Sequence, residues 1–269
     1  MAQNDAGFVG SMPQFYDTHM GNLLFQPYAD DIAARLAGIT QGRLLETAAG
    51  TGIVTATLAA KLPPTVEITA TDLNQPMLDF AKGKPGMDRV TFQQADAQAL
   101  PFADAAFDVL VCQFGVMFFP DKAQGFREAY RVLKPGGQLI FNVWDNRAAN
   151  PMMDAVIVAL EQRYPAHPSW FMERTPMGYR DQSIIRADMQ KGGFTDASFE
   201  TLARPGRAPS PEGPAMGLCQ GSPLRAEIEA IDPGGLADAT KAVAAGIAQR
   251  CGKGAFETIL QAVVITARK

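Results

Sequence analysis

Between residues 43 and 145, short apolar or β-branched runs alternate with stretches of helical spacing. This alternation predicts successive strand-helix-strand units, in which parallel strands form a sheet covered by helices. The predicted strands are residues 43–48, 65–71, 90–95, 107–112 and 138–144. The predicted helices are residues 53–62, residues 75–82, and a segment that Asp121 caps and Pro135-Gly136-Gly137 ends. We therefore expect a doubly wound α/β core.

Outside this core the pattern is less regular. The further predicted elements are helices at residues 152–164 and 181–194 and strands at residues 196–203 and 256–267. Aromatic residues between positions 8 and 38, from Phe8 to Tyr28, predict a helical arm packed on the core or folded over a ligand. The expected organisation is an N-terminal helical arm or lid (1–38), a core (39–204 and 253–269) and an inserted helical cap (205–252).

Composition and charge narrow the class of function. The chain is 47% hydrophobic and has no apolar run near the roughly 20 residues of a membrane helix, so we expect a soluble protein without membrane insertion. The N-terminal residues show no signal-peptide pattern.

Three cysteines without CxxC spacing argue against disulfides or a zinc site. We therefore expect a cytoplasmic location and no bound metal. A net charge of -4 without a basic run disfavours nucleic acid and favours a small-molecule partner.

The stretch LLETAAGTG, residues 44–52, follows the first predicted strand. In a doubly wound sheet, ligands bind outside the carboxyl ends of the strands, next to this turn. Gly50 and Gly52 can adopt positive φ and expose backbone N–H groups. The loop predicts a nucleotide-like ligand, although a tight strand-to-helix turn without a ligand would use the same residues.

The loop does not fit the common dinucleotide and phosphate motifs. The third glycine of G-x-G-x-x-G is replaced by Thr55 or Ile53, depending on the frame, and no P-loop sequence is present. Glu46 would repel a pyrophosphate but attract an ammonium group. These residues favour a ligand that joins adenosine to a positively charged amino acid, and they disfavour an NAD-dependent oxidoreductase.

Two further acids follow the next two predicted strands. Asp72 is placed to accept hydrogen bonds from both ribose hydroxyls, unless it only caps a helix. Leu73 and Met77 follow it as an apolar wall for a purine, although Met77 suits a plain core position equally well. Asp96 can accept the exocyclic amine of adenine, with the backbone N–H of Ala97 or Gln98 as a donor; the alternative for Asp96 is an Asx-turn.

Taken together, LLETAAGTG, TATDLNQPML, DAQALPFADAAFDVLVCQFGVMFF and REAYRVLKPGGQLIF resemble the class I S-adenosylmethionine (SAM)-dependent methyltransferases. The resemblance is strongest to the small-molecule branch of ubiquinone and menaquinone C-methyltransferases, and it covers about residues 16–145. It implies a Rossmann-like, doubly wound, mostly parallel seven-stranded sheet with a reversed last strand, an N-terminal helical arm, and a helical insertion before that strand. The implied cofactor is SAM.

The resemblance also implies cofactor roles for individual residues. The implied cofactor-binding residues are Tyr16, Glu46, Thr47, Ala48, Gly50, Asp72, Leu73, Met77, Asp96, Ala97 and Gln113. Ala48 stands where the family commonly has glycine. Because alanine tolerates ordinary strand-end dihedral angles, we expect a slightly displaced loop that still binds SAM.

Methyl transfer from a sulfonium is a direct displacement, so the main task of the protein is to align the acceptor. His19, in the arm, is the candidate general base, with a surface imidazole as the alternative. No N-P-P-Y-like sequence follows the fourth strand, which disfavours amide or nucleobase nitrogen as the acceptor. The expected function is methylation of an apolar or aromatic small molecule. The alternative is a SAM-binding regulatory protein or pseudoenzyme.

Overall fold

The computed structural model describes residues 7, 10 and 12–269. Phe8, which the sequence places in the arm, lies outside the described residues. The described part of the arm is helical, as expected. Its elements are α1 (Met12–Tyr16), a π-helix (Asp17–Phe25) and α2 (Gln26–Arg35).

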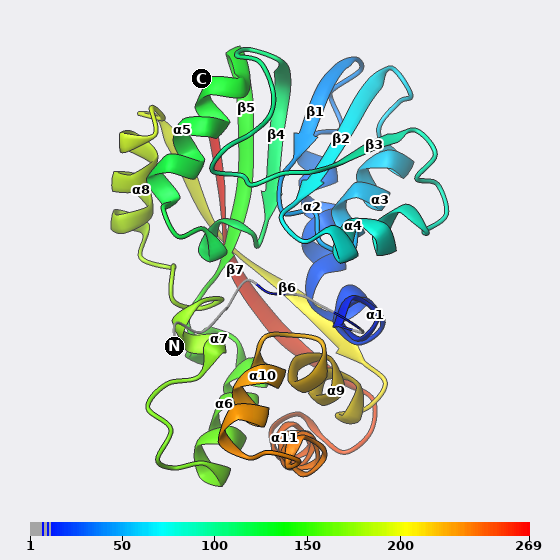
Figure 1. Cartoon of the computed structure of the whole chain (residues 1–269), viewed down its shortest axis with the longest axis vertical. Coiled ribbons are helices and arrows are strands. Elements are labelled where there is room, and N and C mark those ends of the chain that lie inside the picture. The colour runs from blue at the N-terminus through cyan, green and yellow to red at the C-terminus, as the bar shows by residue number, and fades with distance from the viewer. Residues whose placement is uncertain (1–6, 8–9, 11) are drawn as a thin grey trace. The chain divides into compact units, whose positions relative to one another are not determined.

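In the described part of the chain, seven strands form one sheet in the order β3-β2-β1-β4-β5-β7-β6 (Figure 1). The strands are β1 (Gly42–Glu46), β2 (Val66–Asp72), β3 (Val90–Gln94), β4 (Phe107–Gln113), β5 (Leu133–Trp144), β6 (Ala197–Ala208) and β7 (Phe256–Arg268). Strands β1 to β5 pair in parallel, and β7 runs antiparallel to β5. The expected mostly parallel sheet with a reversed last strand is confirmed.

Helices cover both faces of this sheet (Figure 1). These helices are α2, α3 (Ile53–Lys61), α4 (Gln75–Lys82), α5 (Lys122–Val132) and α8 (Gln182–Lys191). The Thr55 hydroxyl of α3 bonds to Glu46 of β1, whereas Phe126 of α5 packs against Phe141 of β5. Since successive strand residues point to opposite faces, these contacts place α3 on one face and α5 on the other.

The end of α5 differs from the expectation. The helix stops at Val132, and β5 begins at Leu133, so Pro135-Gly136-Gly137 lies inside the strand and does not end the helix. Gly136 adopts φ +78°, and its N–H donates to the Lys269 carbonyl at 2.8 Å. The pairing with β4 passes from Phe107–Leu133 to Val109–Gln138, so residues 134–137 form an irregular insertion in the strand that bonds to the end of the chain. Strand β6 also runs beyond its expected end at residue 203.

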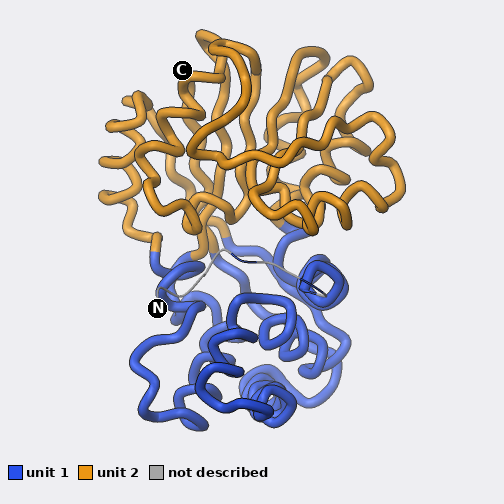
Figure 2. Tube along the Cα trace, in the orientation of Figure 1, with its two compact units in different colours: residues 1–27, 145–178, 203–261 blue, residues 28–144, 179–202, 262–269 orange. Residues whose placement is uncertain are grey.

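The described chain divides into two compact units (Figure 2). Unit 1 comprises residues 1–27, 145–178 and 203–261, and unit 2 comprises residues 28–144, 179–202 and 262–269. Unit 1 groups the expected cap, 205–252, with residues 145–178, which the sequence assigns to the core. The division into arm, core and cap as domains stays a prediction.

Unit 1 is mainly helical. Its longer helices are α6 (Pro151–Arg163), α9 (Glu212–Gln220), α10 (Leu224–Ile231) and α11 (Leu236–Cys251), and α7 (Phe171–Arg174) is a single turn. Helices α6 and α11 approach closely because Gly246 has no side chain: a Cβ there would lie 2.9 Å from the Cβ of Ala159. Among the described residues, no helix is long and apolar enough to cross a membrane.

Candidate functional site

Three acidic side chains stand at the carboxyl ends of three neighbouring strands of unit 2. Glu46 ends β1, Asp72 ends β2, and Asp96 follows β3. In the sheet register Glu46 pairs with Ala70, and Asp72 pairs with Gln94. Because neighbouring strands lie about 4.8 Å apart, the three acids share one edge of the sheet. Their contacts with a ligand stay predictions.

Glu46 is the most deeply buried of the three acids, with 1% of its surface exposed. Its Oε2 accepts a hydrogen bond from the Thr55 hydroxyl at 2.7 Å. Burial raises the pKa of Glu46 to about 8; the bond from Thr55 opposes this rise, and the charge of Asp72 adds to it. No described Lys, Arg or His pairs with Glu46. A ligand cation placed here would favour the ionised carboxylate.

Asp72 ties the glycine loop to β2. Its Oδ2 accepts from the Gly50 N–H at 2.8 Å, and its Oδ1 accepts from the Asn74 N–H at 2.8 Å. Burial raises the pKa of Asp72, although these hydrogen bonds oppose the rise. The N-cap of α4 is Asn74, so Asp72 is not the capping residue. Oδ1 also accepts from the Asn74 Nδ2 at 3.4 Å, whereas Oδ2 can accept a further hydrogen bond from a ligand hydroxyl.

Asp96 forms the Asx-turn that was its alternative interpretation. The Gln98 N–H donates to Asp96 Oδ1 at 2.8 Å, and the Ala99 N–H donates to the Asp96 carbonyl at 2.9 Å. The turn fixes the direction of the carboxylate. Its contact with a base stays a prediction.

The backbone conformation of Ala48 in the glycine loop differs from the expectation. Ala48 adopts φ +53°, in the left-handed region, and not the ordinary strand-end dihedral angles expected for alanine. Gly50 and Gly52 adopt φ +57° and +78°. A Cβ on Gly115 would lie 2.4 Å from the Cβ of Ala48. The alanine methyl therefore fits because residue 115 has no side chain.

The end of β4 contributes a second left-handed residue. Gln113 is the last residue of the strand, and Phe114 follows it with φ +50°. The Phe114 N–H donates to Asn142 Oδ1 at 2.9 Å, and its ring stacks on Trp144 with centroids 3.9 Å apart. Gln113 is among the cofactor residues predicted from the sequence, whereas Asn142 is not. Gly115, directly after Phe114, was the available sign of a turn.

Thr51 was also missed. It is 1% exposed, and its hydroxyl has no hydrogen-bond partner among the described residues. A polar residue between Gly50 and Gly52 was the available signal. In the same described part of the chain, no three His, Cys, Asp or Glu residues are grouped to hold a metal ion.

The span with this geometry matches known proteins. Residues 45–141 match the family described as a methyltransferase domain. The ubiquinone/menaquinone biosynthesis C-methyltransferase UbiE of Geotalea daltonii is 40% identical over 103 residues, which are 37% of this chain and 44% of that protein. The chain carries a class I SAM-dependent methyltransferase domain. It spans less than half the length of the Geotalea protein, so the activity of the whole protein is a separate proposal.

Two further comparisons extend beyond the methyltransferase domain. UbiE of Escherichia coli O139:H28 is 29% identical over 180 residues, which are 62% of this chain and 72% of that protein. The crystal structure of the YcgJ protein of Bacillus subtilis has a TM-score of 0.58 and 19% identity, and it covers 90% of this chain and 98% of that chain. At this identity the likeness shows the fold alone.

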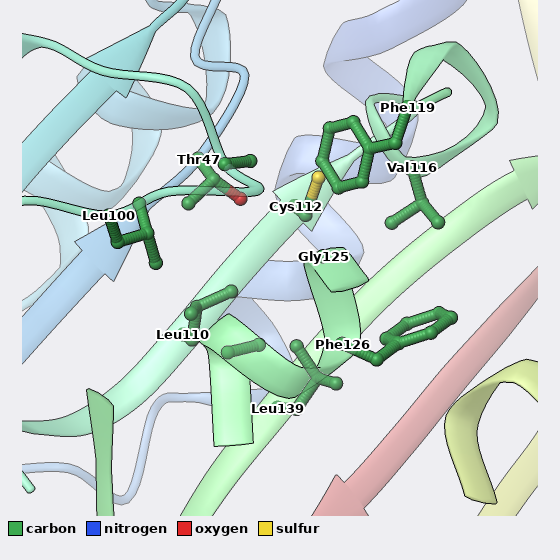
Figure 3. Close-up of a pocket in the computed structure, with 11 residues that line it drawn as sticks. Thr47, Leu100, Leu110, Cys112, Val116, Phe119, Gly125, Phe126 and Leu139 are labelled. Carbon is green, nitrogen blue, oxygen red and sulfur yellow. The ribbon is translucent and has the colours of Figure 1, made fainter. Parts of the chain in front are cut away.

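The methyltransferase domain has a small cavity on the α5 side of the sheet. Thr47 and Ala97, both expected cofactor contacts, line it together with Cys112 (Figure 3). Its volume of about 10 Å³ holds roughly one water molecule and no purine ring. Leu73 is 52% exposed beside Asp72, whereas Met77 is 3% exposed. Leu73 therefore offers an open apolar surface, and Met77 packs in the core.

The remaining expected residues belong to unit 1. Tyr16 stacks on Phe25 with ring centroids 4.9 Å apart, and the ring centroids of His19 and Phe15 are 6.1 Å apart. A Cβ on Gly217 of α9 would lie 2.9 Å from the Cβ of His19. These contacts pack residues 15–25 of the arm within unit 1. Roles of Tyr16 at the cofactor and of His19 in catalysis stay predictions.

Proposed function

We propose that this protein transfers the methyl group of SAM to a small-molecule acceptor with apolar or aromatic surface. The main support for this proposal is the arrangement of three acids at the carboxyl edge of the sheet. Glu46 and Asp72 end two adjacent strands, and Asp96 follows the third. The names of the matched relatives, which describe C-methylation in ubiquinone and menaquinone biosynthesis, support an acceptor of this class.

The residues at this edge fit SAM. Glu46 offers a buried carboxyl for an ammonium group, Asp72 has acceptor capacity for ribose hydroxyls, and Leu73 offers an exposed apolar surface for the purine. When bound, SAM supplies an electrophilic methyl on sulfur. The chain then has to orient the two reactants and exclude water, and no covalent enzyme intermediate is needed.

A base is needed only if the acceptor loses a proton during transfer. His19 remains our proposed base. His167, the other histidine of the chain, contacts Glu227 Oε1 through its Nε2 at 2.8 Å and lies against the Trp170 ring, which supports a packing role. We also propose a cytoplasmic location and no nucleic-acid partner, as the sequence predicts.

Turnover tests the proposal directly. The purified protein would be incubated with methyl-labelled SAM and with fractions of small molecules extracted from its native cells. We expect S-adenosylhomocysteine (SAH) to form, and label to enter one apolar fraction, only when both protein and fraction are present. SAM binding without turnover in every fraction would instead support the regulatory or pseudoenzyme alternative.

His19→Ala and His19→Gln test the base once a labelled acceptor is known. We expect a lower kcat with little change in KM for SAM, because the base acts on the acceptor and not on the cofactor. Wild-type turnover by both variants would remove His19 from the mechanism. Methyl transfer itself would remain established by the wild-type result.

A further inference from the structure

Asn142 is a fully buried polar residue in an otherwise apolar stretch of β5, with 0% exposure. Its Oδ1 accepts from the Phe114 N–H at 2.9 Å, and its Nδ2 has no hydrogen-bond partner among the described residues. A buried amide donor without a partner destabilises the folded protein. Such a group calls for an explanation, and a ligand atom or bound water is one.

The orientation of the Asn142 amide follows from its partner. A backbone N–H can only donate, so the atom that faces Phe114 must be the carbonyl oxygen Oδ1. The Nδ2 group is therefore the part that remains available. Exchanging the two atoms would place donor against donor and lose the bond that holds a left-handed residue.

The sheet register places Asn142 in line with the predicted cofactor residues. Asn142 pairs with Gln113 on β4, and Glu46 pairs with Val111 on the same strand. Because register partners share a face and side chains repeat every two residues, Glu46, Gln113 and Asn142 lie on one face of the sheet. All three lie near its carboxyl edge.

The order of the strands indicates which part of SAM lies nearest. Asp96, Asp72 and Glu46 follow β3, β2 and β1, which we assign to the base, the ribose and the ammonium group. Strands β4 and β5 come next in the sheet. The carboxylate of the amino-acid end is the anionic group of the ligand, and it needs hydrogen-bond donors on that side.

Given the proposed SAM site, we propose that Asn142 is a positioning residue for the amino-acid end of the cofactor. Its Oδ1 holds the turn formed by Gln113, Phe114 and Gly115. Its Nδ2 donates to the ligand carboxylate, directly or through one ordered water. The residue thereby joins the shape of the turn to the charge of the ligand.

Two ligands separate this role from general support of the fold. SAH carries the amino-acid end, whereas 5′-methylthioadenosine has the same nucleoside and sulfur without it. We expect Asn142→Asp, which keeps the acceptor and replaces the donor, to weaken SAH binding at least about tenfold, the scale of a lost bond to a charged group. Binding of 5′-methylthioadenosine should change less than about threefold on the same scale. Calorimetry measures both.

Asn142→Leu, which cannot ionise, should lower the same SAH to 5′-methylthioadenosine affinity ratio. Asn150 provides the matched control, because it is also 0% exposed but bonds to Gln261 through both ends of its amide. Asn150→Asp should leave the ratio unchanged. If both Asn142 variants bind the two ligands with the wild-type ratio, the proposal is wrong. Failure of the wild-type protein to bind SAH would overturn the proposed function itself.

A measurement on the wild-type chain does not depend on the folding of any variant. The side-chain amide resonances of Asn142, assigned by triple-resonance NMR, should shift on addition of SAH but not of 5′-methylthioadenosine. Equal responses to the two ligands would contradict a role at the amino-acid end.

Discussion

At the scale of single residues, Glu46 carries a proton that the folded protein holds more tightly than the unfolded chain. Its pKa rises from 4.5 to about 8 on burial. An acid with a raised folded-state pKa favours folding while it stays protonated, and this contribution is lost as the pH rises from about 4.5 towards 8. Burial also raises the pKa of Asp72, which contributes with the same sign.

We therefore expect the ligand-free protein to lose stability relative to Glu46→Gln as the pH rises from 5 to 8. Denaturant unfolding of both proteins across this range gives the difference in free energy of unfolding. A difference that stays constant with pH would show that Glu46 is not protonated in the folded state.

Asp72 supports an affinity prediction. Asp72→Ala removes the acceptor proposed for the ribose hydroxyls, and SAM binding should weaken by about 1 to 3 kcal/mol. Calorimetric titration with SAM measures the loss. Asp238→Ala, on the exposed surface of α11, is the control and should bind SAM like the wild type. Unchanged affinity in Asp72→Ala would show that its role is misassigned.

Ala48 supports the prediction that a substitution increases the stability of the fold. A left-handed conformation costs a non-glycine residue about 1 to 2 kcal/mol, whereas glycine costs about 0.5 to 1 kcal/mol of additional chain entropy. Ala48→Gly should therefore stabilise the protein by about 0.5 to 1 kcal/mol in denaturant unfolding. Ala49, which lacks a positive φ, provides the control: Ala49→Gly should destabilise. Equal losses in the two variants would contradict strain at Ala48.

At the scale of helices and strands, local signals predicted the core well. Helix α4 occupies residues 75–82 as expected, because Pro76 suits the first helical turn and apolar residues recur on one side. The start of α5 was equally readable from Asp121. These features depend on neighbouring residues, and sequence patterns record such neighbours directly.

Features set by distant contacts were not predictable. Leu133 starts a strand because it pairs with Phe107 of β4, and Gly136 and Gly137 then bond to Lys269 at the end of the chain, more than a hundred residues away. Asn142 looks like an ordinary strand residue until Phe114, 28 positions earlier, is seen to donate to it. The left-handed Ala48 likewise depends on the space that Gly115 leaves. The acids of the site were found because strand ends are local features, whereas the residues that hold the turns were missed.

The cap of α5 gives a prediction at this scale. The Asp121 carboxylate accepts from the Gln124 N–H at 2.9 Å, so Asp121→Ala should destabilise the protein by about 0.5 to 2 kcal/mol. Asp121→Asn keeps an acceptor in place and should cost much less. Thermal and denaturant unfolding measure both, and equal losses would mean that the cap does not contribute.

At the scale of the whole molecule, the site residues of unit 2 lie on segments far apart in the chain but gathered at one sheet edge. SAH binding should therefore slow backbone hydrogen exchange in four separate segments. These segments are residues 46–52, 72–74, 96–98 and 113–116. Exchange followed by mass spectrometry with and without SAH measures this pattern. Equal slowing over all of unit 2 would indicate general stabilisation by the ligand and no defined edge site.

One carboxylate of this edge serves two parts of the molecule, since Asp72 faces the proposed ribose position while it also holds the Gly50 N–H of the glycine loop. Replacing this acid so that the protein accepts an altered sugar would also disturb the loop beside the opposite end of the cofactor. A design that accepts SAM analogues should therefore leave Asp72 in place and vary the purine side at Leu73, whose side chain is half exposed.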